Sequence, residues 1–152
     1  MVKDDPLPQS DHVLRYVGGK DIDRGEINGS GFLCRPTEAA PSVNWLECFV
    51  GALANQVEQV RQRARISYGA TARFVRLNVG YSSEYVFNND PNSLRIEFVL
   101  DPLIEDVVRH FPADPSHSLM QGVPKIDTPE GELIGDLLVE CIVDSFPARR
   151  SK

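Results

Sequence analysis

The stretch with the clearest potential for chemistry is PADPSHSLMQGVP, residues 112–124. His117 follows Asp114 by three residues, and a carboxylate that bonds a histidine ring can orient it and raise its basicity, which suits a general base. The same residues also suit a turn, because Pro115 holds Asp114 extended and the Asp114 side chain can accept bonds from nearby backbone amides. We therefore predict a turn here, and a catalytic pair only if His117 faces a cleft.

A nucleophile for His117 would have to come from elsewhere in the chain. The possible residues are Ser30, Ser42, Cys34 and Cys48, and none lies in the G-x-S-x-G pattern of a nucleophile elbow. Ser42 is a good N-cap for a long predicted helix, and Cys48 would lie in the apolar half of that helix. Both assignments favour structural roles for these two side chains.

One enzyme hypothesis remains open, in which Arg15, Ser30, Asp114 and His117 form a catalytic site. Arg15 lies on a predicted first strand and Ser30 in a glycine-rich segment, so the two could hold the phosphate and ribose of a ligand. The chain would then be a small transferase or hydrolase. No cofactor is expected, because residues 17–31, VGGKDIDRGEINGSG, match neither the dinucleotide-binding nor the P-loop spacing.

A metal site is not expected from the sequence. The histidines are far apart, none at the i, i+3 or i+4 spacing that brings ligands together on a helix, and no C-x-x-C pair occurs. The cysteines are odd in number and widely spaced, which is typical of reduced, buried thiols. The residues concerned are His12, His110, His117, Cys34, Cys48 and Cys141.

The segment SVNWLECFVGALANQVEQVRQRAR predicts one long helix over about residues 42–65. Its apolar residues recur at alternating spacings of three and four, which is the period of one helix face. The outer half is polar except for a thin apolar stripe, and such a stripe with polar flanks also suits pairing with another helix. We therefore predict a protein-binding or self-association surface made of Val57, Val60, Arg61, Ala64 and Arg65.

The rest of the chain indicates an α+β fold, a single domain over residues 1–152 with a mostly antiparallel sheet of about five strands. A C-terminal helix is expected at about 129–146, capped by Thr128 and with Pro129 at its first position. Residues 1–11 are expected to form a flexible arm and 147–152 a tail. The expected strands lie at 12–17, 31–35, 72–80, 94–100 and 116–123, the third and fourth as antiparallel neighbours, with a short helix at 101–112.

Composition narrows the classes of function. The 152 residues are 41% hydrophobic and 25% charged, and no apolar run is long enough to span a membrane. A net charge of −6 argues against general nucleic-acid binding, although five arginines and no acid lie between Arg61 and Arg76. We expect a cytoplasmic, acidic protein that binds another macromolecule as an accessory or regulatory component, with the small transferase or hydrolase as the alternative.

Overall fold

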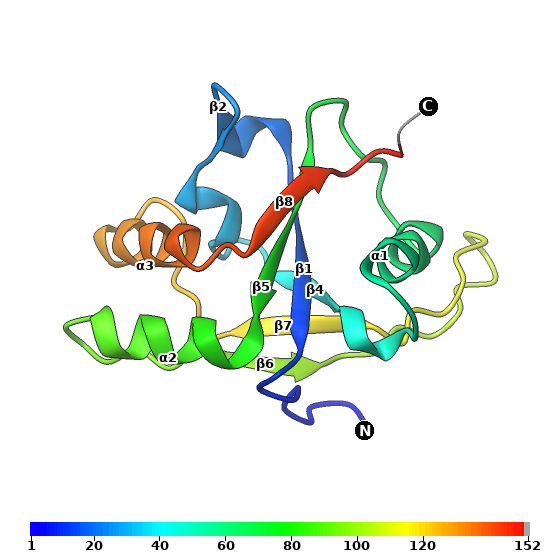
Figure 1. Cartoon of the computed structure of the whole chain (residues 1–152), viewed down its shortest axis with the longest axis horizontal. Coiled ribbons are helices and arrows are strands. Elements are labelled where there is room, and N and C mark those ends of the chain that lie inside the picture. The colour runs from blue at the N-terminus through cyan, green and yellow to red at the C-terminus, as the bar shows by residue number, and fades with distance from the viewer. Residues whose placement is uncertain (151–152) are drawn as a thin grey trace.

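An antiparallel sheet of six strands, in the order β6-β7-β4-β1-β5-β8, forms the centre of the protein. The computed structural model describes residues 1–150 and has the α+β architecture expected from the sequence, with a separate two-stranded ribbon, β2-β3 (Figure 1). The strands are β1 (His12–Val17), β2 (Ile22–Asp23), β3 (Glu26–Ile27), β4 (Ser42–Trp45), β5 (Arg73–Asn78), β6 (Glu97–Leu100), β7 (His117–Gln121) and β8 (Asp144–Pro147). The helices are α1 (Leu53–Gln62), α2 (Val79–Asn89) and α3 (Pro129–Glu140), with 3₁₀ turns at Gly19–Asp21, Gly29–Phe32 and Leu46–Cys48.

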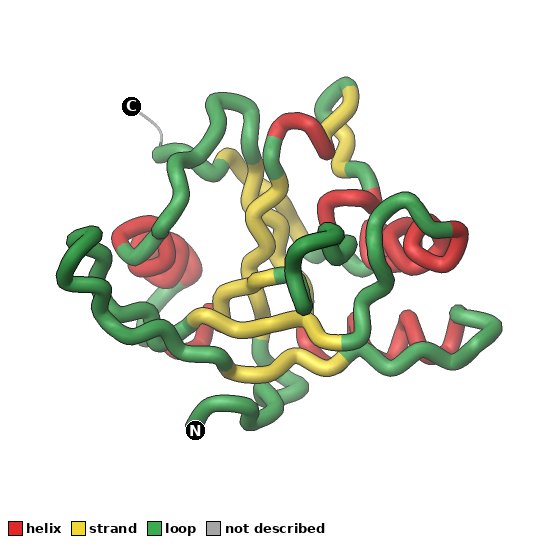
Figure 2. Tube along the Cα trace, turned by 180° about the vertical axis from the view of Figure 1, so that it is seen from behind, coloured by secondary structure: helices red, strands yellow, loops and turns green. Residues whose placement is uncertain are grey.

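The sheet parts between β1 and β4. These strands pair at only two positions, Val13 with Trp45 and Leu14 with Asn44, whereas β1 pairs with β5 at six. Beyond Leu14 the strands diverge, so that β1, β5 and β8 run in a different direction from β6 and β7 (Figures 1 and 2). The parting leaves backbone carbonyls of the β4 side without the strand partner that a continuous ladder would supply.

Two hydrophobic cores lie on opposite faces of the sheet. Alternate residues of β1 point to opposite sides, so Val13 and Val17 join the larger core with residues of α2 and α3, while Leu14 joins the smaller one. Helix α1 covers the smaller core and lies apart from α2 and α3 (Figure 1). No helix within residues 1–150 has the length and apolar character needed to cross a membrane.

The predicted helix over 42–65 is wrong in its first half. Residues Ser42–Trp45 form β4, and α1 begins only at Leu53. Gly51 between them has φ +102°, a left-handed conformation that ends regular structure, and Val50 is 87% exposed. The spacing of three and four therefore ran across a strand, a 3₁₀ turn and a short helix, and it did not mark one continuous face.

Two valines of the surface predicted to bind a partner belong to this chain's own core. Val57 and Val60 are each only 3% exposed and pack in the smaller core with Leu14 and Phe74. Arg61 donates from Nε to the backbone oxygen of Ala148 at 2.8 Å, so this residue is also used internally. Ala64 and Arg65, the other two residues of that surface, are half-buried and line a cleft, and partner binding there stays a prediction.

Several other expected elements differ because their partners are distant in sequence. The C-terminal helix starts as predicted, with Thr128 Oγ1 accepting from the Gly131 amide, but it ends at Glu140, and 144–147 form β8 beside β5. Residues 79–89 form α2, and β6 pairs with β7 rather than with β5. The expected helix at 101–112 is a hairpin, closed by bridges between Leu103 and Asp114 and between Asp106 and Phe111. In the expected strand at 31–35, the first two residues belong to a 3₁₀ turn and only Cys34 makes an isolated bridge.

The N-terminal arm is docked and not free. The Asp4 amide donates to Leu100 O at 2.7 Å and the Leu7 amide to Phe98 O at 2.9 Å, so the arm follows the edge of β6. Leu7 is buried in the larger core. In the expected tail, Pro147 ends β8 and Ala148 is fully buried, while residues 151 and 152 lie outside the described part.

Changing Val60 to Asp should unfold the protein rather than break an assembly. A carboxylate placed in the smaller core would lose its hydration without gaining a partner, and we expect Val60→Asp to lower the free energy of unfolding by about 3–5 kcal/mol. The exposed Val50 provides the matched control, and Val50→Asp should change it by less than about 0.5 kcal/mol. Urea denaturation measures both, and equal stability of the two variants would contradict this placement of α1.

Candidate functional site

A cleft of about 540 Å³ opens where the sheet parts. Its walls come from β1, β4, the start of β7, the segment that follows α1 and the loops around Asp21 and Arg35. This volume is in the range of small-molecule sites. Arg15, Ser42, Asn44, Asp114 and His117 all line it.

Arg15 fills the wedge between β1 and β4. Its Nε donates to Gly31 O at 2.9 Å and its Nη1 to Ser42 O at 2.8 Å, so the guanidinium takes the place of the missing strand pairing. The residue is only 9% exposed, and burial lowers the pKa of its guanidinium. Within residues 1–150 no carboxylate lies within 4.0 Å of it, and its Nη2 has no protein partner.

The cleft is basic although the whole chain is acidic. Its acids are all engaged: Asp21 with Ser30 and Arg35, Glu38 with the Arg35 amide, and Asp114 as described below. Five basic residues against three acids give the lining a formal charge of +2, with the histidine neutral. The basic residues are Arg15, Lys20, Arg35, Arg63 and Arg65.

Ser42, His117 and Asp101 form a hydrogen-bonded series at the cleft. His117 Nε2 lies 3.1 Å from Ser42 Oγ, and His117 Nδ1 lies 2.8 Å from Asp101 O and 3.3 Å from Asp101 Oδ2. The backbone oxygen can only accept, so Nδ1 carries the ring proton, and in the neutral ring Nε2 is left to accept from the Ser42 hydroxyl. This is the geometry of a nucleophile, a base and a group that orients the base.

Asp114 does not orient His117, as the catalytic interpretation of this pair required. Its carboxylate accepts from the Ser116 amide at 3.0 Å, from Ser116 Oγ at 2.7 Å and from Asn44 Nδ2 at 3.0 Å. These are the bonds of a turn, and they join the start of β7 to β4. The acid that His117 meets is Asp101, sixteen residues earlier.

Ser30 does not join Arg15 and His117. It lies outside this cleft, donating to Asp21 Oδ1 at 2.9 Å and lining a second, smaller pocket beside α3. The serine that does lie between Arg15 and His117 is Ser42. The sequence contained a signal for it, since Ser42 was among the possible nucleophiles, but its assignment as a helix cap hid that role.

Aromatic side chains also form part of the cleft wall. The rings of Tyr16 and Tyr68 are stacked with centroids 5.3 Å apart, and Phe74 meets Tyr68 edge-on at 5.2 Å. Burial raises the pKa of Tyr68 to about 12, so this side chain is uncharged near neutral pH. Such a wall offers stacking and apolar contact to a flat ring.

Two of the three thiols are poor candidates for the nucleophile. Burial raises the pKa of the Cys48 thiol, and it raises that of Cys141 to about 11, so both are protonated and weak nucleophiles near neutral pH. Among residues 1–150 no group of three or more His, Cys, Asp and Glu side chains is arranged to hold a metal ion.

Comparisons with known proteins give no indication of the function, which is therefore inferred from the geometry of the cleft. The chain matches no family model, no curated protein and no solved structure.

Replacing Asp114 tests the turn that supports the cleft. Asp114→Ala leaves the amide and hydroxyl of the buried Ser116 without their acceptor and removes one of the two bonds of the half-buried Asn44 side chain, and we expect the free energy of unfolding to fall by about 2–3 kcal/mol. Glu105→Ala, an exposed acid in the adjacent hairpin, should cost less than about 0.5 kcal/mol. Urea denaturation compares them, and an Asp114→Ala variant as stable as the wild type would show that these bonds contribute nothing.

Proposed function

We propose that the chain is a small transferase or hydrolase whose cleft binds a phosphate-bearing molecule with a flat ring, of the nucleotide class. The observation that carries this proposal is Arg15, a buried cation that among residues 1–150 has no carboxylate within 4.0 Å and feels Glu38 and Asp21 only at longer range. Taking a guanidinium out of water costs several kcal/mol unless an opposite charge or further hydrogen bonds compensate. Two carbonyl oxygens compensate in part, and a phosphate at the free Nη2 would supply the rest.

The rest of the lining supports the same ligand class. The surplus of positive charge favours an anion, and arginine matches the geometry of phosphate oxygens. Tyr16 and Tyr68, which pack on the buried Phe74, line the same cleft and suit a base or another flat ring. A ligand that carries both a phosphate and a flat ring can contact both Arg15 and the aromatic side chains.

Binding of AMP and adenosine, which differ by the phosphate, tests the proposal. The wild type should bind AMP at least about tenfold more tightly than adenosine, because the charge-assisted bond to Arg15 is worth more than about 1.4 kcal/mol. Arg15→Gln should remove this preference. Isothermal titration calorimetry measures both affinities, with circular dichroism to show that the variant is folded.

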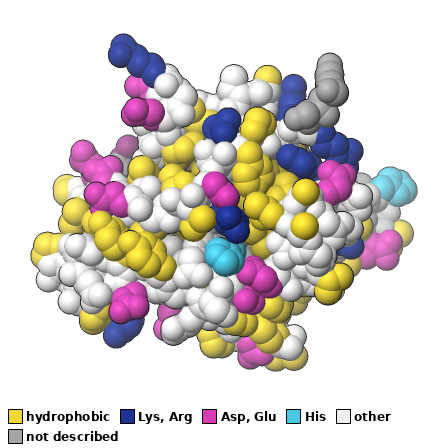
Figure 3. Space-filling model, viewed as in Figure 1, with side chains coloured by type: hydrophobic (Ala, Val, Ile, Leu, Met, Phe, Trp, Pro, Cys, Tyr) yellow, Lys and Arg dark blue, Asp and Glu magenta, His cyan; other side chains and the backbone are white. Residues whose placement is uncertain are grey.

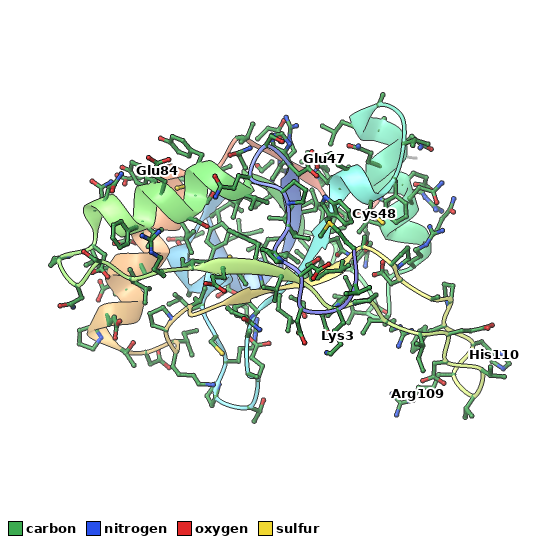
Figure 4. All side chains as sticks on the ribbon, turned by 90° about the horizontal axis from the view of Figure 1, so that it is seen from below. Lys3, Glu47, Cys48, Glu84, Arg109 and His110 are labelled. Carbon is green, nitrogen blue, oxygen red and sulfur yellow. The ribbon has the colours of Figure 1, made fainter. Side chains whose placement is uncertain are left out.

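Arg109→Gln is the matched control, because Arg109 lies at the tip of the 103–114 hairpin, away from the main body of the protein (Figure 4). It should keep the preference for AMP. Equal affinities for AMP and adenosine in the wild type, or the same loss in both variants, would contradict an anchoring role for Arg15.

Macromolecular binding, the function expected from the sequence, remains a second proposal on a different surface. The hairpin exposes Ile104 near its base at 85% and Val107 and Val108 at its tip at 72% and 87%, and the tip projects from the main body (Figure 4). Elsewhere, on the face drawn in Figure 3, hydrophobic side chains lie in several patches separated by polar and charged ones. An exposed apolar tip favours association through the hairpin more than through α1.

Self-association is the form of this second proposal that can be tested without a known partner. The wild type should form dimers at high concentration in analytical ultracentrifugation, and Val107→Ser with Val108→Ser should be monomeric, because the change removes the exposed apolar side chains. A wild type that stays monomeric throughout would contradict self-association through the tip.

A further inference from the structure

The hydroxyl of Ser42 is accessible in the cleft and lies next to a base. It is exposed, it lines the cleft, and its Oγ lies 3.1 Å from the accepting nitrogen of His117. We infer that Ser42 is a nucleophile activated by His117, and that it attacks the acyl carbon of a mixed anhydride between a carboxylic acid and a phosphate. This inference rests on the proposed function, because it requires that Arg15 hold the phosphate of the substrate.

The fold fixes Ser42 and His117 as neighbours on one face. In the β4–β7 pair, Ser42 lies opposite Leu119 and Asn44 opposite His117, so Ser42 and His117 are diagonal neighbours on the same side of the sheet. Diagonal positions are within reach of a long side chain such as histidine. The contact therefore follows from strand register and does not depend on a loop.

Asp101 is a positioning residue for His117. Its amide donates to His117 O at 2.9 Å while its own backbone oxygen meets Nδ1 at 2.8 Å, so the two residues fix each other. Lys3, on the docked arm, donates to Asp101 Oδ1 at 2.7 Å and leaves Oδ2 toward the ring. A carboxylate in this place stabilises the imidazolium that forms when the serine proton is taken.

The place of Arg15 indicates the class of substrate. Its Nη1 binds the backbone oxygen of Ser42 itself, so an anion at the free Nη2 would lie beside the nucleophile rather than at a remote end of the ligand. A base that removes the serine proton assists addition to an acyl carbon most, because phosphoryl transfer through a loose transition state needs little proton removal. An acyl group joined directly to a phosphate satisfies both conditions, because it places an acyl carbon at the nucleophile and an anion next to that carbon.

The reaction balances with water as the only co-reactant. Ser42 Oγ adds to the acyl carbon as its proton passes to His117 Nε2, and the bond from the acyl carbon to the phosphate oxygen breaks. The phosphate leaves against Arg15 and takes the proton from His117. Water then gives a proton to His117 and adds to the acyl-serine, and the carboxylic acid leaves as Ser42 recovers its proton.

Covalent labelling tests the nucleophile. A fluorophosphonate should form a bond with Ser42 Oγ and release fluoride, and tandem mass spectrometry should find the label on Ser42. Ser42→Ala should abolish the label and His117→Gln should slow it by at least about 100-fold. Ser30→Ala, a serine outside the cleft, should be labelled at the wild-type rate, and circular dichroism should show that every variant is folded.

Phosphate release from acetyl phosphate tests the substrate class. The wild type should hydrolyse it and form an acetyl-Ser42 species, and Ser42→Ala should lose at least about 99% of the rate. Asp101→Asn should lower the rate and Asp101→Glu should restore part of it, which a purely structural role would not give. No label on Ser42, or equal hydrolysis by the wild type and Ser42→Ala, would overturn the inference.

The two proposals fail in different ways. AMP binding that depends on Arg15, with an unreactive Ser42, would overturn the nucleophile and leave the ligand site. A reactive Ser42 with no protection from labelling by AMP, and no preference for AMP over adenosine, would overturn the ligand class and with it the assignment of an acyl phosphate.

Discussion

The arrangement of the cleft depends on the two hydrogen bonds that the buried guanidinium of Arg15 donates. Strands β1 and β4 separate after two paired positions, and a parted sheet leaves carbonyl groups that need donors. Arg15 donates to one of them, Ser42 O at the start of β4, and also to Gly31 O in the 3₁₀ turn at Gly29–Phe32. The side chain that stabilises the parting is therefore also the cation at the base of the cleft, so fold and site share one constraint.

The other parts of the site follow from the same parting. Ser42 is free to face the cleft because no residue of β1 pairs with it, while its pairing with β7 sets it diagonal to His117. The N-terminal arm lies along β6 at the edge of the sheet, and there Lys3 donates a hydrogen bond to Asp101, the residue that follows β6. Strand pairing thus brings Ser42 and His117 together, and side-chain hydrogen bonds add Arg15 and Lys3, although these residues span most of the chain.

Local sequence signals were sufficient for elements whose cause is local. Strand 12–17, the α+β class and the start of the C-terminal helix at Thr128 and Pro129 are all as predicted, because alternation, composition and capping act within a few residues. The helix predicted over 42–65 failed because apolar residues that serve two different cores happened to follow a helical spacing. Ser42 was consequently taken for a cap, and its approach to His117, 75 residues away, depends on strand pairing that no local pattern specifies.

A crystal structure of the protein with AMP tests the central claim most directly, that the cleft binds a phosphate through Arg15. We expect a phosphate oxygen at hydrogen-bonding distance, about 2.7–3.0 Å, from Arg15 Nη2, with the purine against the wall formed by Tyr16 and Tyr68. The opposite result would be AMP bound away from the cleft, or an Arg15 whose Nη2 is bonded to a carboxylate of the protein itself.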